Sequence, residues 1–197
     1  MSQYPDACFL TSANRPDQFV ADTGAEVAFA GRSNAGKSSA INAIVNQRNF
    51  ARTSKSPGRT QLINFFQLRA EQRLVDLPGY GYAKVSRSVQ QHWQKLLGAY
   101  FERRQSLVGL IVVVDIRRGL SDYDWRMLNW AAELDCAAHV LLTKADKLKR
   151  GAAAQAMLQA QGELMDVAGV QLFSALKRDG VETARQALDQ MLTGATA

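Results

Sequence analysis

The sequence predicts an α/β fold, with a mostly parallel, doubly wound sheet and helices on both faces. Apolar runs of strand length alternate along the chain with segments whose apolar residues recur at helical spacing. The runs are continuous, which is typical of strands that are buried on both faces of a parallel sheet. With 197 residues, 47% of them hydrophobic, the chain can bury a sizeable core. We therefore expect a single domain, 1–197, with a short N-terminal extension of about residues 1–22.

Five apolar runs are the predicted strands, and two shorter runs are weaker candidates. The five are Ala25–Ala30, Leu62–Leu68, Arg73–Asp76, Leu107–Asp115 and His139–Thr143. Val170–Phe173 is the candidate for a sixth strand, and Cys8–Thr11 for an edge strand.

Helices are expected between these strands. They are predicted at Ser39–Val45, along the apolar stripe Val89–Phe101, at Ala152–Met165 and at Val181–Leu192. A further helix is indicated by Ser121, which is followed three residues later by Asp124, the spacing of a capping box. Asn49–Thr60 and Pro78–Arg87 contain Pro and Gly and are predicted to be loops, at the places where a nucleotide-dependent switch would lie.

Basic residues are concentrated in one part of the chain. The net charge is +6, and no acidic residue occurs between Glu26 and Glu71. The basic residues of that stretch are Arg32, Lys37, Arg48, Arg52, Lys55, Arg59 and Arg69. One bound nucleotide requires only part of this charge, so an anionic macromolecule such as RNA is one interpretation. A solubilising surface is the other, and charge alone does not separate them.

The composition argues against several classes of protein. The longest aliphatic stretch, Leu110–Val114, is far shorter than the roughly 18 residues that a membrane span requires. The first residues lack the basic and apolar pattern of a signal peptide, so we expect a cytoplasmic protein with no membrane partner. Cys8 and Cys136 are too few for a disulfide framework or a zinc site, and we expect reduced thiols.

Residues 31–39 form a glycine-rich pattern between an expected strand and an expected helix. In such a phosphate-binding loop, main-chain N–H groups surround a polyanion that the helix N-terminus faces. We expect phosphate contacts from Gly31, Arg32, Ser33, Asn34, Ala35, Gly36, Lys37, Ser38 and Ser39. Lys37 would place its charge between the β- and γ-phosphates, and Ser38 would offer a hydroxyl to Mg²⁺. Gly31 and Gly36 would allow turns and a close approach that a Cβ would block.

Two short motifs follow at the ends of later strands. Asp76-Leu-Pro-Gly79 begins 39 residues after Lys37; Asp76 would join the Mg²⁺ shell, and the Gly79 N–H would reach a γ-phosphate. Thr143-Lys-Ala-Asp146 ends another strand, where Asp146 would accept hydrogen bonds from the N1–H and the exocyclic amine of guanine. The alkyl chain of Lys144 would cover the purine ring.

Ser174-Ala-Leu176 follows the last expected strand, where the Ala175 N–H would meet the guanine O6. In this order the four motifs predict a protein that binds and hydrolyses GTP. Two alternatives stay open. One is an ATP-dependent small-molecule kinase, which would need an acceptor site and a lid but no Thr143–Asp146 motif. The other is an RNA-binding module with a regulatory nucleotide site.

Together these motifs resemble the EngB family of bacterial GTPases. The similar segments, between about Phe9 and Leu192, are GRSNAGKSS, SPGRTQLINFF, DLPGYGYAKV, LLTKADKL and FSAL. The resemblance implies a Ras-like P-loop GTPase fold and a role in maturing the large ribosomal subunit, with links to cell division and septation. The implied partners are GTP or GDP, the large-subunit precursor and ribosomal RNA, and we expect a monomer.

The resemblance also implies roles for single residues. Thr60 matches the first-switch threonine whose hydroxyl joins Mg²⁺ in the GTP state. Thr143 stands where many GTPases have a base-contacting asparagine, which implies a weaker contact with guanine N7. Asn34 matches an asparagine that holds K⁺ in some related GTPases, and a loop-stabilising role is an equal alternative.

The expected catalytic residues are Lys37, Thr60 and Gly79. The expected reaction is the in-line attack of a water molecule on the γ-phosphate of GTP. The residue after Gly79 is Tyr80, where small GTPases often have a glutamine that orients this water. A phenol does not replace that amide, so we expect slow intrinsic hydrolysis, helped by K⁺ or by the ribosomal partner.

Overall fold

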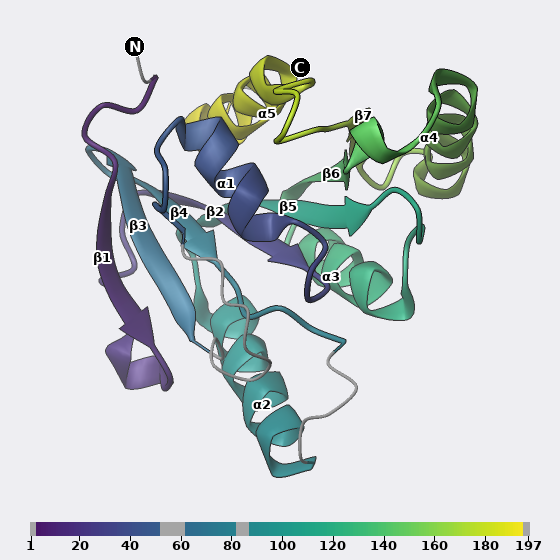
Figure 1. Cartoon of the computed structure of the whole chain (residues 1–197). Helices are drawn as coiled ribbons and strands as arrows, with labels where there is room; N and C mark the ends of the chain where they lie inside the picture. The colour runs from purple at the N-terminus through teal and green to yellow at the C-terminus, as the bar shows by residue number, and fades with distance from the viewer. Residues whose placement is uncertain (1–2, 52–61, 82–86, 195–197) are drawn as a thin grey trace.

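A computed structural model describes residues 3–51, 62–81 and 87–194. Its centre is a seven-stranded sheet with the strand order β1-β3-β4-β2-β5-β6-β7 (Figure 1). The strands are β1 Cys8–Ala13, β2 Ala25–Gly31, β3 Ile63–Arg69, β4 Gln72–Asp76, β5 Leu107–Asp115, β6 Ala137–Thr143 and β7 Gly169–Leu172. From β4 to β7 in this order all neighbours are parallel, whereas β3 is antiparallel to both β1 and β4.

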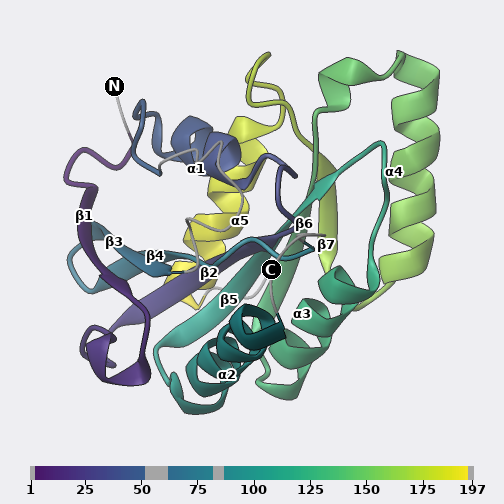
Figure 2. The same ribbon diagram turned by 60° about the horizontal axis from the view of Figure 1, so that its bottom comes forward.

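Helices cover both faces of this sheet. They are α1 Lys37–Val45, α2 Arg87–Arg103, α3 Asp122–Glu133, α4 Arg150–Leu164 and α5 Val181–Thr193, with short 3-10 turns at Pro16–Gln18 and Ala145–Lys147. α1 and α5 lie on one face, and α2 and α3 lie on the other (Figure 2). Over the described part of the chain, none of these helices has both the length and the apolar composition needed to cross a bilayer.

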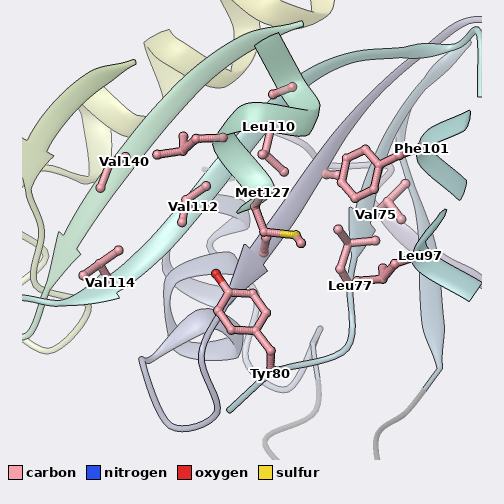
Figure 3. Packing of buried hydrophobic residues seen from close by; sticks show 14 of the residues in the cluster. Val75, Leu77, Tyr80, Leu97, Phe101, Leu110, Val112, Val114, Met127 and Val140 are labelled. Atoms are coloured by element: carbon pink, nitrogen blue, oxygen red, sulfur yellow. The ribbon is translucent and has the colours of Figure 1, made fainter. Parts of the chain in front are cut away.

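The central strand β5 explains why the apolar runs of the sequence do not alternate with polar residues. Leu110, Val112 and Val114 contribute to one core cluster (Figure 3), and Ile111 and Val113 contribute to the cluster on the opposite face. All five side chains are buried. Because helices cover both faces, an apolar residue is required at each of these positions. The predicted doubly wound, mostly parallel α/β fold is confirmed.

The ends of the predicted elements differ from the structure by at most two residues. α1 starts at Lys37 instead of Ser39, because Gly36, with φ 103°, is already its N-cap. The Ser121–Asp124 capping box is confirmed at the start of α3. The antiparallel pairing of β1 with β3 is not predicted by the sequence, and it makes part of the N-terminal extension a strand of the sheet.

A buried charge cluster attaches the N-terminal segment to the amino ends of the parallel strands. Glu26, at the start of β2, is fully buried. Its carboxylate accepts hydrogen bonds from Arg73 (2.7 Å), Arg104 (2.5 and 3.1 Å) and Tyr100 (3.1 Å). The two guanidinium groups also donate to main-chain carbonyls of residues 20–23. The cluster therefore joins two strands, the end of α2 and the N-terminal segment through one carboxylate.

We expect Glu26→Gln to lower the free energy of unfolding by about 3–5 kcal/mol, since it removes the charge that compensates two buried guanidinium groups. Urea denaturation measures this loss. Asp17→Asn is the control, because Asp17 is 67% exposed in its ion pair with Arg15 and should contribute about 0.5 kcal/mol or less. A loss below about 1 kcal/mol for Glu26→Gln would show that the cluster is not a main source of stability.

Candidate functional site

The four sequence motifs lie at one edge of the sheet. The glycine-rich loop begins with the last residue of β2, Asp76–Gly79 with the last residue of β4, and Thr143–Asp146 with the last residue of β6. Ser174–Leu176 comes shortly after β7. These strands are parallel, so their carboxyl ends meet on the same side, where open α/β sheets bind ligands. The structure therefore brings the predicted residues together, while their individual roles stay predictions.

The shape of the loop depends on particular residues. Asn34 and Gly36 have left-handed main-chain conformations, with φ of 63° and 103°. Asparagine is one of the few non-glycine residues that adopts this conformation readily, which supports the loop-stabilising interpretation of Asn34. A Cβ on Gly31 would come 2.7 Å from the carbonyl oxygen of Val113. The close approach predicted at Gly31 is therefore an approach to β5.

Lys37 and Asp76 form a largely buried ion pair. Lys37 is the first residue of α1 and Asp76 the last residue of β4, and the Lys37 Nζ donates to Asp76 Oδ1. Their side chains are 11% and 5% exposed. Ser38 and Ser39 follow Lys37 in the first turn of α1. If a phosphate drew Lys37 away, the buried Asp76 carboxylate would require another cation.

The oxygen donors beside this ion pair suit Mg²⁺. This ion usually binds through one or two carboxylates together with substrate phosphates and water. Asp76 offers a carboxylate, and Ser38 offers a hydroxyl from the adjoining helix turn. Within the ranges that the structure describes, no group of three or more His, Cys, Asp or Glu residues is arranged to hold a metal ion. A carboxylate and a hydroxyl are donors of the kind that Mg²⁺ uses together with a nucleotide.

The segment after β4 lies directly against the loop. The Tyr80 N–H donates to the Gly31 carbonyl (3.3 Å), and the Ser33 N–H donates to the Tyr80 carbonyl (2.8 Å). A Cβ on Gly79 would come 3.4 Å from the Ser33 Cα. Gly81 has a φ of 75°, and a Cβ there would come 2.9 Å from a side-chain nitrogen of the loop. A Cβ on Gly79 would therefore make only an ordinary van der Waals contact, whereas Gly81 is favoured by its left-handed φ.

The side chain of Tyr80 projects into the hydrophobic core (Figure 3). It is 3% exposed, stacks on Tyr123 with ring centroids 5.7 Å apart, and donates its hydroxyl to Asp124 Oδ1 (2.5 Å). Burial, reinforced by the Asp124 carboxylate, raises the pKa of Tyr80 well above its ordinary value. The phenol therefore stays protonated, as a hydrogen-bond donor inside the core.

The Thr143–Asp146 motif, which is expected to contact the guanine base, is called the base motif below. Thr143 and Lys144 attach it to the glycine-rich loop. The buried Thr143 Oγ1 lies 2.5 Å from the Ala35 carbonyl oxygen and 3.0 Å from that of Val114, both of which can accept its proton. The Lys144 Nζ donates to the Asn34 carbonyl (2.6 Å). The Thr143 hydroxyl is thus engaged by main-chain carbonyls, which is consistent with the weak N7 contact that the resemblance implies.

Asp146 lies in the short 3-10 turn after β6 and is held by a residue from the turn after β7. Its Oδ1 accepts a hydrogen bond from the fully buried Ser174 Oγ (2.6 Å), and its Oδ2 lies 3.6 Å from the Lys147 Nζ. The Ser174 hydrogen bond lowers the pKa of Asp146 below its ordinary value. Ala175 is half-buried and Leu176 is exposed in the same turn. The orienting contact of Ser174 is not foreseen by the sequence analysis.

Asp115, at the end of β5, is a further residue that the sequence analysis misses. It is 5% exposed and accepts hydrogen bonds from Arg117 Nε (2.9 Å), Arg117 Nη2 (2.7 Å) and Lys144 Nζ (2.9 Å). These cations, Arg117 above all, hold the pKa of Asp115 far below its usual range. Lys144 is therefore fixed between Asp115 and the loop. The sequence did contain a signal for Asp115, because it is an acidic residue at the end of an apolar strand, as Asp76 is.

Thr60 lies outside the described residues, together with Arg52, Lys55 and Arg59 of the predicted basic stretch. The first-switch and Mg²⁺ roles of Thr60 therefore stay predictions.

Two sequence comparisons bear on the family of this chain. A family model described as "50S ribosome-binding GTPase" matches residues 26–144. A probable GTP-binding protein EngB from Nitrosococcus oceani is 54% identical over 194 residues, which cover 97% of this chain and 97% of that protein.

Solved structures share the fold. A crystal structure of a probable GTP-binding protein engB matches with a TM-score of 0.69 and 22% identity, over 86% of this chain and 100% of that chain. Era, in complex with MgGDPNP and a segment of 16S ribosomal RNA, matches with a TM-score of 0.63 and 19% identity, over 85% and 56% of the respective chains. The P-loop GTPase fold and the resemblance in the sequence are confirmed. This chain belongs to the EngB family of GTP-binding proteins, and its reaction is the hydrolysis of GTP to GDP and phosphate.

Proposed function

We propose that this GTPase is a slow switch in the assembly of the large ribosomal subunit, acting as a cytoplasmic monomer. One observation carries the proposal, in a chain of the EngB family. Thr143 and Lys144 attach the base motif to the glycine-rich loop. The match of residues 26–144 to the model of 50S ribosome-binding GTPases supports a partner on the large subunit. Membership of the family favours a GTPase over the ATP-dependent kinase that the sequence leaves open.

In the proposed site the phosphates lie on main-chain N–H groups of the loop, residues 31–39, at the N-terminus of α1. The N–H groups of Ser33 and Ala35 already donate to the Tyr80 and Arg32 carbonyls, so the remaining N–H groups of the loop are the proposed donors. Lys37 exchanges Asp76 for the β- and γ-phosphates, and the Gly79 N–H binds the γ-phosphate. These donors stabilise the charge that spreads over the phosphate oxygens while water attacks in line and the bond to the leaving oxygen breaks. Mg²⁺, for which Ser38, Asp76 and Thr60 are the proposed ligands, supplies further neutralisation of the phosphates when it is bound.

Guanine selection is proposed to reside at the neighbouring strand ends. The Asp146 carboxylate, oriented by Ser174, accepts hydrogen bonds from the N1–H and the exocyclic amine of guanine. Adenine does not offer this pair of donors, so a site built for guanine rejects it. The alkyl chain of Lys144 covers one side of the purine, and the Ala175 N–H, followed by Leu176, meets the O6 atom.

The buried position of Tyr80 supports a low intrinsic rate. Its hydroxyl is bonded to Asp124 in the core, so the side chain that follows Gly79 does not orient a water molecule at the phosphates. K⁺ beside Asn34, or a group from the ribosomal particle, would supply the missing stabilisation. The left-handed conformation of Asn34 is explained equally well by the shape of the loop.

Exposed basic residues beside the proposed guanine-binding residues support an RNA partner. We define the basic rim as Arg117, Arg118, Lys147, Lys149, Arg150, Lys177 and Arg178, all of which are exposed. They follow β5, β6 and β7, which are neighbouring parallel strands, and Asp179 is the acidic residue of the same turn as Lys177. Lys and Arg side chains gathered on one edge attract a polyanion such as ribosomal RNA. The basic stretch Arg48–Arg59 lies mostly outside the described residues, and its contact with RNA stays a prediction.

Asp146→Asn should weaken GTP binding by about tenfold or more and improve the binding of xanthine nucleotides, whose altered edge suits an amide. Competition of GTP, XTP and ATP against a fluorescent guanine nucleotide measures both effects. Asp179→Asn, which neutralises an exposed carboxylate on the neighbouring turn, should leave the preference unchanged. An Asp146→Asn variant that still preferred GTP over XTP as the wild type does would remove Asp146 from the site.

Lys37→Met should lower the affinity for GTP and GDP by well over tenfold, because losing a buried charged contact typically costs about 2–5 kcal/mol. The substitution keeps most of the alkyl chain, and circular dichroism checks that the variant is folded. Lys149→Met is the control, since Lys149 is an exposed lysine at the N-cap of α4. Normal nucleotide affinity in folded Lys37→Met protein would argue against a phosphate site at the loop.

Co-sedimentation with large ribosomal subunits tests the proposed partner. The form loaded with a GTP analogue should bind better than the GDP form, and binding should fall steeply with salt because RNA contacts release counterions. Replacing Lys149, Arg150 and Lys177 by glutamine should weaken binding and reduce the salt slope by about three, with GTP affinity unchanged.

The control for this experiment replaces Arg15, Lys95 and Arg103, three exposed basic residues away from the basic rim, and should leave binding near the wild-type level. The proposed partner is wrong if neither nucleotide form sediments with large subunits. The rim is wrong as the contact surface if both triple variants bind equally well.

A further inference from the structure

Tyr80 connects the phosphate loop to the N-terminus of α3. Its main chain is hydrogen-bonded to Gly31 and Ser33 and forms a parallel bridge with Arg32. Its hydroxyl donates to Asp124, a residue of the first turn of α3, 44 positions further along the chain. The residue directly after Gly79 is therefore held at its main chain by the loop and at its side chain by a helix.

Asp124 uses both carboxylate oxygens in this arrangement. Oδ2 accepts hydrogen bonds from the Ser121 N–H (2.8 Å) and the Ser121 hydroxyl (2.6 Å), and Oδ1 accepts the Tyr80 hydroxyl (2.5 Å). Asp124 is only 2% exposed, so water does not replace these donors readily. If the Tyr80 hydroxyl left, a buried charged oxygen would lose its hydrogen bond, which is a costly change.

The ring of Tyr80 has a fixed place between two helices. Its centroid lies 5.7 Å from that of Tyr123 on α3 and 6.1 Å from that of Trp93 on α2. The hydroxyl therefore has little freedom to reach another acceptor while the ring stays packed. Because Gly79 and Tyr80 share a peptide bond, a fixed Tyr80 also limits where the main chain of Gly79 can lie.

We propose that Asp124 is a positioning residue for GTP hydrolysis: by holding the Tyr80 hydroxyl, it fixes the main chain of Gly79 beside the phosphate loop, where Gly79 meets the γ-phosphate. The inference rests on the proposed function, which gives Gly79 this contact. A segment that is ordered in advance loses less conformational entropy when GTP binds. GDP lacks the γ-phosphate, so its binding does not depend on the position of Gly79.

Tyr80→Phe tests the inference, because it removes the hydroxyl and keeps the buried ring. The affinity for a non-hydrolysable GTP analogue and the single-turnover hydrolysis rate should each fall about five- to tenfold. The affinity for GDP should stay within about twofold of the wild type, since GDP makes no contact with Gly79. Titration of the full chain with fluorescently labelled nucleotides gives both affinities. Release of phosphate from bound GTP gives the single-turnover hydrolysis rate.

Tyr100→Phe is the matched control. Tyr100 is fully buried, and its hydroxyl also donates to a buried carboxylate, Glu26 Oε2 (3.1 Å), but at the opposite end of the sheet. It should lower the resistance to urea while keeping the wild-type ratio of GTP-analogue to GDP affinity. Asp124→Asn perturbs the same contact from the other side and should lower this ratio as Tyr80→Phe does. If Tyr80→Phe does not fold, the Asp124→Asn variant tests the inference in its place.

A wild-type ratio and a wild-type rate in folded Tyr80→Phe or Asp124→Asn protein would overturn the inference. An equal fall of the ratio in Tyr100→Phe would also overturn it, because general loosening of the core would then be the cause. The proposed function fails in a different way, namely when the wild-type chain binds neither GTP nor GDP.

Discussion

The hydrogen bond from the Thr143 hydroxyl to the Ala35 carbonyl is the interaction on which the candidate site depends. Ala35 is buried, and a buried carbonyl requires a hydrogen-bond donor. A hydroxyl from the end of β6 supplies the donor, and Lys144 does the same for the neighbouring carbonyl of Asn34. Two segments more than a hundred residues apart thereby acquire a fixed separation. A nucleotide needs such a separation, because its base and its phosphates are joined covalently.

Charged groups are used differently at the two ends of the sheet. At the amino ends, Glu26 is paired with two guanidinium groups that also donate to main-chain carbonyls of the N-terminal segment. Such a buried network specifies structure. At the carboxyl ends, Lys37 is bound to one carboxylate, and Lys144 is bound to one carboxylate and one carbonyl. Lys37 can exchange its carboxylate partner for an anion, which is what a binding site requires, whereas Lys144 holds the loop in place.

The sequence predicted the strands of the sheet well because helices bury both faces, so the strands appear as continuous apolar runs. It also placed Asp76 and Asp146 at the edge where parallel strands end, because Asp76 closes such a run and Asp146 follows one in a short motif, while their roles stay predictions. Asp115 closes a run as well, but its importance comes from the pairing of β5 with β6, which places it beside Lys144. The contact between Tyr80 and Asp124 could not be predicted either, because it too joins residues that are distant in the sequence. Each residue has an adequate local explanation, one as part of a glycine-rich turn and one as part of a helix cap.

The Lys37–Asp76 pair gives the proposed site a reason to bind nucleotide and Mg²⁺ together. Both side chains are largely buried, so each depends on the charge of the other. A phosphate that attracts Lys37 would leave Asp76 ionised in a place that water reaches poorly, and this penalty would oppose nucleotide binding. A divalent cation on Asp76 removes the penalty and at the same time neutralises the phosphates. By linkage, each of the two ligands must then strengthen the binding of the other, with the ion pair between α1 and β4 as the element that couples them.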